Sequence, residues 1–240
     1  MHILMLCEYF YPFDRGGSEW STYYLAQSLV NKGHTVSIFT PNYGDKPTET
    51  WKGIQIHRFW FPIRLKKGRG QVASPLWHSN LLWILVTVIN LLRLLGKNTI
   101  DVIHIQGKYF LPSMYLVKKI TKKPVVCTVR DFQLLCPYGL CLSKKRRYKV
   151  ASLAEFVGWE MWEYQQIYGS GKNPLLRILL VIAGLRGFLV SRMLIFFARR
   201  VDCVITISNS MKRILSVNGI ESQVIYNPMF FFRPKIKKTD

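Results

Sequence analysis

A loop that ends in a glycine pair is the first segment whose residue types could do chemistry. Gly16 and Gly17 follow a short apolar strand and directly precede a helical pattern that begins near Ser18. Glycine lets the backbone come close to a ligand, and the N-terminus of a helix favours an anion. Two interpretations stay open: a phosphate-binding loop, or a turn that needs glycine flexibility, with Ser18 as the helix N-cap. The loop lacks the G-x-G-x-x-G pattern, which disfavours a nicotinamide-dependent dehydrogenase.

The cysteines indicate a reduced protein without a metal centre. There are five, an odd number without paired spacing, which argues against a secreted disulfide framework and for a cytosolic protein. Cys136 and Cys141 are close enough in sequence to suggest a metal site, but zinc usually takes four ligands and no histidine is near them. We therefore expect no metal. The sequence also has no Ser/His/Asp pattern, so nucleophilic catalysis is not indicated.

The elements that must position these residues alternate between short strands and helices. Such an order is typical of βαβ units and a parallel sheet, and continuous apolar strands indicate a sheet covered on both faces. We predict the α/β class, with one doubly wound, mostly parallel Rossmann-like sheet over residues 1–228 and a linker-like basic tail over 229–240. Ligands bind such sheets beyond the carboxyl ends of the strands, where the glycine pair would lie. Strands are expected at 2–6, 35–40, 53–60, 101–105, 124–129, 202–207 and 223–226, and helices at 18–31, 80–95, 109–119, 151–168, 174–200 and 208–217.

An ordered set of motifs in this region resembles the N-terminal domain of family 4 glycosyltransferases, which have the GT-B fold. Their order and spacing carry the resemblance, which covers about residues 1–228. The motifs are Tyr11-Pro12 with Gly16-Gly17-x-Glu19, Leu25-Ala26-x-x-Leu29, Gly33-His34-x-Val36, Asp101-Val102-Ile103-His104 with Gly107, Pro124-Val125-Val126 running into Asp131, Asp202-x-Val204-Ile205-x-Ile207-Ser208, and Val224-Ile225-Tyr226-Asn227-Pro228.

The resemblance implies a sugar transfer from a nucleotide-sugar with retained anomeric configuration, in a cleft between two Rossmann-like domains. It implies no metal and no permanently bound cofactor, since the nucleotide-sugar is a substrate. The N-terminal domain mainly binds the acceptor, with Gly16 and Gly17 near the donor phosphates and Glu19 in the same substrate-binding motif. The donor domain of the family carries a Glu-x7-Glu pair, and Glu155, Glu160 and Glu163 have other spacings. We therefore expect the C-terminal donor domain to be absent, supplied by a separate subunit or lost by truncation.

Four residues at the expected carboxyl edge are further candidates. Where many members of the family carry His-Asp, this sequence has Arg130 and Asp131, which we take as the candidate catalytic pair. A guanidinium can clamp a phosphate but cannot act as a base at neutral pH. Arg130 would contact a phosphate of donor or acceptor, and the alternative is a salt bridge to Asp131 or another local carboxylate. His104, followed by Gln106, could bind acceptor hydroxyls, and the alternative is a satisfied core histidine.

The charge distribution predicts an anionic membrane surface as partner. The net charge is +21, from 34 Lys and Arg against 13 Asp and Glu. Residues 50–100 contain eight Lys and Arg and no acid, and 164–201 contain six, again without an acid. Basic amphipathic helices bind anionic lipid. The arginines in the two longest apolar segments argue against a clean membrane span. A soluble basic surface is the alternative, and nucleic acid is the disfavoured rival, since no nucleic-acid motif is recognised.

Together these observations predict the acceptor-binding half of a nucleotide-sugar-dependent, retaining glycosyltransferase. It would build a glycan, such as a polysaccharide, or a glycolipid on a lipid-linked acceptor. Its expected location is cytoplasmic, peripheral on the inner face of the cell membrane. The alternative is a non-catalytic module that recruits or binds at the membrane, or an inactive truncated remnant.

Overall fold

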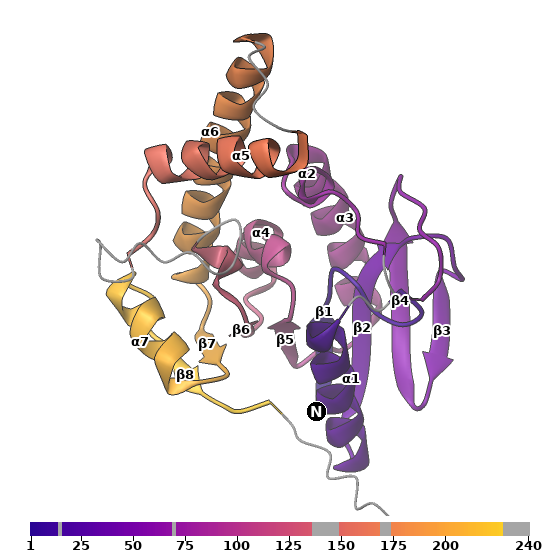
Figure 1. Ribbon diagram of the computed structural model, residues 1–240. Coiled ribbons are helices and arrows are strands. Elements are labelled where there is room, and N and C mark those ends of the chain that lie inside the picture. Colours follow the sequence, from indigo (N-terminus) through magenta and orange to yellow (C-terminus); the bar gives the residue numbers. More distant parts are fainter. Residues whose placement is uncertain (14–15, 69–70, 136–148, 169–173, 228–240) are drawn as a thin grey trace, which may run out of the picture.

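The computed structural model describes residues 1–13, 16–68, 71–135, 149–168 and 174–227. An eight-stranded sheet with the order β3-β4-β2-β1-β5-β6-β7-β8 forms its centre, and every neighbouring pair is parallel except β3 and β4 (Figure 1). This confirms the doubly wound, mostly parallel α/β fold. The strands are β1 (His2–Leu6), β2 (Thr35–Asn42), β3 (Thr48–Trp51), β4 (Ile54–Trp60), β5 (Val102–Ile105), β6 (Val125–Val129), β7 (Cys203–Thr206) and β8 (Gln223–Val224).

Helices cover both faces of the sheet, which explains the continuous apolar strands. In β1, Met5 belongs to a core cluster that includes Ala26 of α1, whereas Leu4 and Leu6 point to the opposite face, in the cluster that contains residues of α3, α4 and α6. The described helices are α1 (Gly17–Asn31), α2 (Pro75–His78), α3 (Leu81–Lys97), α4 (Leu111–Thr121), α5 (Leu153–Tyr168), α6 (Pro174–Ala198) and α7 (Asn209–Val217), with 3-10 turns η1 (Lys108–Phe110) and η2 (Phe132–Leu134).

The edge strand β3 and the short helix α2 are absent from the sequence-based prediction. β3 pairs antiparallel with β4 through a turn in which Lys52 and Gly53 have φ angles of 50° and 77°. Its residues Thr48–Trp51 are largely polar and only half-buried or exposed, so they lack an apolar pattern that would reveal a strand. A Lys-Gly turn next to an apolar strand is the signal that could have indicated the hairpin.

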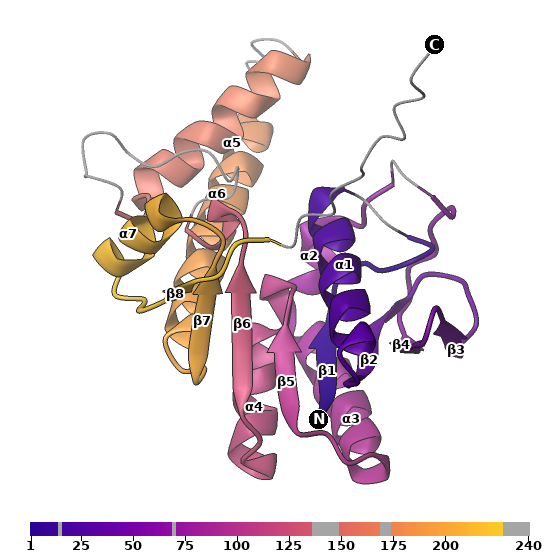
Figure 2. The ribbon, with the colours of Figure 1, turned by 90° about the horizontal axis from the view of Figure 1, so that it is seen from below.

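The helices α5 and α6 form a hairpin at one end of the sheet. α5 crosses α6 (Figure 1), and they touch closely, because a Cβ at Gly184 would lie 2.7 Å from the Cα of Val157. The C-terminal end of α6 is part of the core through Leu194, Ile195 and Ala198. Its N-terminal part extends past the carboxyl ends of the strands (Figure 2). The hairpin therefore joins the core of the domain to a projecting helical arm.

By length and composition, the part of α6 from Leu175 to Ala198 could cross a membrane. Several of its apolar side chains are exposed, including Ile178, Ile182 and Leu189. At its other end, however, Ser191 is buried and donates a hydrogen bond to the carbonyl oxygen of Leu134. In the structure α6 is thus a core helix at one end and an exposed apolar helix at the other.

Candidate active site

The carboxyl ends of β1, β5 and β6 meet the N-terminal end of α1 at one edge of the sheet (Figure 2). A cavity of about 300 Å³ opens there, which we call the edge cavity. It brings together residues from four segments that are far apart in the sequence. Five of the seven site residues expected from the sequence line it, namely Gly16, Glu19, Gln106, Arg130 and Asp131.

The glycine pair lies at the start of α1, where Gly16 is the N-cap and Gly17 the first helical residue. The expectation of Ser18 as N-cap is wrong by two residues, because Glu19 closes the helix end instead. Its Oε2 accepts a hydrogen bond of 2.7 Å from the N–H of Gly16, and its Oε1 accepts one of 2.9 Å from the Ser18 hydroxyl. The exposed Gly17 is not among the residues that line the edge cavity.

No described contact explains why glycine occupies these two positions. Gly16 has an extended φ of −179°, which any residue adopts, and Gly17 has no positive φ. A Cβ at Gly17 would meet nothing within 4 Å, and one at Gly16 would meet only the Glu19 carboxylate at 4.0 Å. The interpretation as a turn that needs glycine flexibility therefore loses its support. Close approach of a phosphate to this backbone stays a prediction.

Glu8 lines the same cavity and was missed by the sequence analysis. Its carboxylate lies against the backbone of Gly107, where a Cβ would be 2.6 Å from the Glu8 Cδ. Its Oε1 accepts a hydrogen bond of 2.7 Å from the N–H of Tyr109. Removal from water raises the pKa of Glu8 to about 7, against the opposing effects of the Lys108 ammonium and the Tyr109 N–H. The position directly after a buried strand was the available signal.

Lys108 supplies a second charge that the sequence analysis missed. Its ammonium contacts the amide oxygen of Gln133 and lies 4.0 Å from a carboxylate oxygen of Asp131. Burial lowers the pKa of Lys108, although Asp131 and Glu8 oppose this. Asp131 is exposed and is the N-cap of η2. Its carboxylate accepts a hydrogen bond from the N–H of Gln133. The Lys108 ammonium therefore lies near the carboxylates of both Glu8 and Asp131 at the edge cavity.

Arg130 is only weakly engaged by the rest of the described chain. Its Nε donates one long hydrogen bond of 3.5 Å to Asn227 Oδ1, and its Nη1 is buried without a partner among the described residues. Burial is the main cause that lowers its pKa. The expected alternative, a salt bridge to Asp131, is not found among the ion pairs of the described residues. The guanidinium therefore has hydrogen-bond donors available for a ligand.

His104 and Gln106 share β5 and its end but differ in surroundings. The His104 ring lies 2.8 Å from Thr128 Oγ1 in β6, and burial, with Arg130 as the smaller cause, lowers its pKa to about 4. It does not line the edge cavity, and this geometry fits the alternative of a satisfied core histidine. Gln106 lines the cavity, accepts a 3.4 Å hydrogen bond from Thr22, and has an Nε2 without a partner in the described chain.

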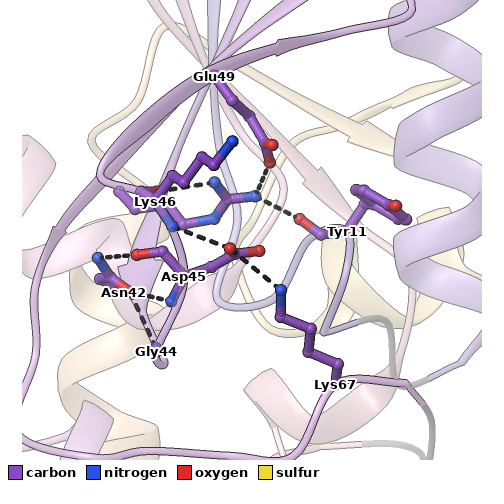
Figure 3. Close-up of polar contacts among 8 residues, drawn as sticks. Tyr11, Asn42, Gly44, Asp45, Lys46, Glu49 and Lys67 are labelled. Atoms are coloured by element: carbon purple, nitrogen blue, oxygen red, sulfur yellow. Dashed lines mark hydrogen bonds and ion pairs between the residues drawn. The ribbon is translucent and has the colours of Figure 1, made fainter.

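A second cavity, of about 670 Å³, opens at the carboxyl ends of β2 and β4, and Arg58 lines it. The Arg58 Nη2 lies 2.5 Å from Glu49 Oε1 and donates to the Tyr11 carbonyl at 2.7 Å. Its Nη1 donates to the Lys46 carbonyl at 3.0 Å. Figure 3 shows Tyr11, Lys46 and Glu49 gathered around this guanidinium. A carboxylate therefore pairs with Arg58 and both of its Nη groups are hydrogen-bonded, while its Nε is buried without a partner among the described residues.

Beside Arg58, a turn holds a second ion pair. Asn42 Oδ1 accepts hydrogen bonds of 2.9 Å from the N–H groups of Gly44 and Asp45. Asp45 lies 3.2 Å from the Lys67 ammonium. Partial burial alone would raise the pKa of Asp45, but hydrogen bonds from Lys46 and Lys67 and the charge of Arg58 hold it below its usual value. Figure 3 shows both ion pairs in one polar cluster.

Comparison with known proteins identifies the family. A family model described as Glycosyltransferase Family 4 matches residues 15–229, most of the chain. The chain belongs to glycosyltransferase family 4. It is therefore a glycosyltransferase domain, and the resemblance predicted from the motifs is confirmed.

Curated relatives match parts of this glycosyltransferase domain. An uncharacterised 42.6 kDa protein in the cps region of Klebsiella pneumoniae is 25% identical over 144 residues, 57% of this chain and 38% of that protein. The GPI3 subunit of the Saccharomyces cerevisiae phosphatidylinositol N-acetylglucosaminyltransferase is 47% identical over 45 residues, 19% of this chain and 10% of that protein. One subunit of the human enzyme of that name is 31% identical over 78 residues, 32% of this chain and 16% of that protein.

Solved structures support the GT-B fold. Sucrose-phosphate synthase from Thermosynechococcus elongatus has a TM-score of 0.57 at 13% identity, over 94% of this chain and 47% of that one. Anabaena HepE, solved in complex with UDP-glucose, has a TM-score of 0.51 at 14% identity, over 95% of this chain and 44% of that one. The glycosyltransferase chain thus spans less than half the length of these proteins and of the Klebsiella relative.

One described cysteine, Cys127, lines the edge cavity. Cys7 and Cys127 are buried, and burial raises the pKa of both thiols, so they stay protonated. Over the described ranges, no group of three or more His, Cys, Asp or Glu side chains could hold a metal ion. The predicted interpretation of Cys136 and Cys141 lies outside the described residues.

Proposed function

We propose that this domain binds the acceptor in a retaining, nucleotide-sugar-dependent glycosyltransferase that builds a glycan or glycolipid at the inner face of the cell membrane. The observation that carries the proposal is the edge cavity, where the unpartnered Nη1 of Arg130 lies in the same pocket as the start of α1. A half-buried guanidinium that forms no ion pair among the described residues favours an anionic ligand. The UDP-glucose complex of HepE, a protein of the same fold, supports a nucleotide-sugar as that ligand.

In this proposal the residues of the edge cavity divide into two roles. Arg130 and the backbone at Gly16 and Gly17 contact donor phosphates, and Arg130 stabilises the negative charge that develops on the leaving group. The free amide N–H group of Gln106 and the carboxyl of Glu8 orient the acceptor. Because the pKa of Glu8 is about 7, both of its protonation states are populated near neutral pH, so it can accept or donate a hydrogen bond. A donor domain would complete the cleft.

The proposed membrane location is supported by exposed apolar side chains. They lie on α2, α3 and α6, and the described residues of α3 and α6 include no acidic residue. Helices of this kind bind anionic lipid surfaces through apolar burial and basic charge. The relatives named as subunits of a phosphatidylinositol N-acetylglucosaminyltransferase support a lipid-linked acceptor. The side chains are Leu76, Trp77, Leu81, Leu82, Leu85, Ile89, Leu175, Ile178, Leu179, Ile182, Leu185 and Leu189.

The proposal is tested by sugar transfer from UDP-sugars into membrane lipids, measured with the chain alone and together with a candidate donor-domain partner. We expect transfer only with the partner, and loss of that transfer in Arg130→Ala. The matched control is Arg213→Ala, which removes an exposed arginine of α7 far along the chain from the site. Transfer by the lone chain would contradict the acceptor-half assignment. No transfer with any partner, together with retained membrane binding, would favour the non-catalytic recruiting module.

A further inference from the structure

A third cavity, of about 400 Å³, lies between α2, η1, α5 and α6, and we call it the hairpin cavity. It shares Lys108 and Gln133 with the edge cavity, so the two are neighbours. Much of its wall is apolar, with Phe156 from α5 and Val190 and Leu194 from α6 among the lining residues. A ligand that extends from one cavity into the other would therefore pass Lys108.

The hairpin cavity contains a second cation, Arg186 of α6. Its Nη2 donates a 2.5 Å hydrogen bond to the hydroxyl of Ser79, which lies at the end of α2. Glu160 is the single carboxylate among the lining residues. No ion pair of the described chain joins Arg186 to a carboxylate. A half-buried guanidinium held by a neutral hydroxyl retains capacity for an anion, and phosphate matches its planar donors.

The surroundings of the hairpin cavity are suited to a hydrocarbon chain. Leu185 and Leu189 flank Arg186 on α6, and they are 42% and 57% exposed. One and two turns away, Ile182 and Ile178 are also more than half exposed. Across the cavity mouth, Leu76 lines the cavity and is 55% exposed. An apolar surface of this extent next to a half-buried cation fits a molecule that has both a phosphate and a long apolar tail.

We infer that the hairpin cavity binds the phosphate that joins a lipid-linked acceptor to its lipid. Arg186 and Lys108 contact the phosphate, the lipid runs along the exposed apolar side chains of α6, and the saccharide extends past Lys108 into the edge cavity. This inference rests on the proposed acceptor-binding function. In this inference α5 and α6 take part directly in substrate selection, because residues of both helices, including Arg186, line the hairpin cavity.

The test is binding of a short prenyl diphosphate, farnesyl diphosphate, to the full chain by titration calorimetry. Farnesol supplies the apolar chain alone, and inorganic diphosphate supplies the anion alone. We expect farnesyl diphosphate to bind at least tenfold more tightly than either part. In Arg186→Gln this affinity should fall about tenfold, the loss expected for one charge-assisted hydrogen bond. Arg186→Lys should recover part of it.

The matched control is Arg177→Gln, which removes an exposed charge from the same helix. An equal loss in Arg177→Gln and Arg186→Gln would overturn the inference, because the effect would then be general electrostatics. Equal binding of inorganic and farnesyl diphosphate would overturn the lipid part. Sugar transfer separates the two proposals. A functional enzyme that binds farnesyl diphosphate independently of Arg186 refutes only this inference, whereas selective binding without any transfer refutes only the proposed function.

Discussion

Two arginines at the same edge of the sheet, Arg58 buried and Arg130 half-buried, differ in their surroundings. Arg58 on β4 pairs with the Glu49 carboxylate and donates to the carbonyls of Tyr11 and Lys46, although its Nε is buried without a partner among the described residues. Arg130, after β6, has one long hydrogen bond to Asn227 and a buried Nη1 without a partner in the described chain. Because burying an unpaired charge costs free energy, the first arrangement is stable by itself. For the second, we propose that a bound ligand completes the arrangement.

The difference follows from which parts of the chain supply polar partners to each arginine. Two partners of Arg58, Glu49 and the Lys46 carbonyl, come from β3 and the preceding turn, close in sequence to β4, whereas the Tyr11 carbonyl is 47 positions away. Arg130 lies where strands from distant parts of the chain end together, and the carboxylates nearest to it are otherwise engaged. Glu19 caps α1, and Asp131 caps η2 and faces Lys108. Neither carboxylate forms an ion pair with Arg130 among the described residues, although the charges of both raise the pKa of Arg130 against the larger effect of burial.

The largest expected effect on stability comes from removing the structural arginine. Arg58→Met leaves Glu49 and two carbonyl groups without their donor. The free energy of unfolding should fall by about 3 kcal/mol, the lower end for breaking a buried pair, since Glu49 is 24% exposed. Urea denaturation followed by circular dichroism measures the change. Arg64→Met, which removes an exposed arginine from the same cavity wall, should change it by less than about 0.5 kcal/mol. Equal stability of Arg58→Met and the wild type would remove the contrast between the two arginines.

The functional arginine should show the reverse pattern. Arg130→Met should leave the free energy of unfolding unchanged or raise it slightly, because a poorly partnered buried charge is replaced by an apolar side chain. Sugar transfer in the presence of a donor-domain partner should fall about 100-fold. This is the loss expected when one preorganised hydrogen-bond donor to the developing negative charge is removed. Transfer rates and urea midpoints are measured on the same preparations. If stability falls as far as in Arg58→Met, Arg130 is a structural residue as well.

A third prediction concerns the glycine that makes room for Glu8. In Gly107→Ala the new Cβ would lie 2.6 Å from the Glu8 Cδ, so the carboxylate must leave its position. We expect a loss of about 2 kcal/mol in the free energy of unfolding, typical of overpacking. Gly96→Ala is the control, since a Cβ there meets nothing within 4 Å in α3 and should stabilise the helix by about 0.5–1 kcal/mol. A neutral Gly107→Ala would show that Glu8 is not held tightly at the edge cavity.

The smallest effect should be the pH dependence that Glu8 adds to stability. Its pKa is about 7 in the folded chain and near 4.5 in the unfolded chain, so folding favours the protonated form. The stabilising contribution is complete below about pH 4.5 and is lost as the pH rises through about 7. Glu8→Gln should therefore be roughly 1–2 kcal/mol more stable than the wild type at pH 8, after allowance for residual solvent access. The difference should vanish near pH 4. Thermal melts of both proteins across this pH range measure the difference. A constant difference in melting temperature between pH 4 and pH 8 would contradict the raised pKa of Glu8.

Much of the fold could be predicted from the sequence because its signals are local. Short apolar strands separated by helical patterns indicate a covered parallel sheet, and seven of the eight strands were expected close to their observed positions. β3 was missed because an exposed edge strand needs no apolar pattern. At the site, the glycine pair before a helix indicated Gly16, the position after a strand indicated Gln106, and the family resemblance indicated Arg130. All three line one cavity. Glu8 follows β1 in the same way and could have been identified by the same argument.

The sequence by itself determined the alternation of elements, the family motifs, and the edge of the sheet at which polar residues gather. Only the tertiary structure decided which of these residues have partners. The contact between Glu8 and Tyr109 joins residues 101 positions apart, and the contact between Arg186 and Ser79 joins residues 107 apart. The polar groups around a charge come from distant as well as near parts of the chain, so residue type and spacing alone cannot distinguish Arg58 from Arg130. Because an unpaired charge is costly to remove from water, the surroundings of Arg130 support the proposal that it binds an anionic ligand.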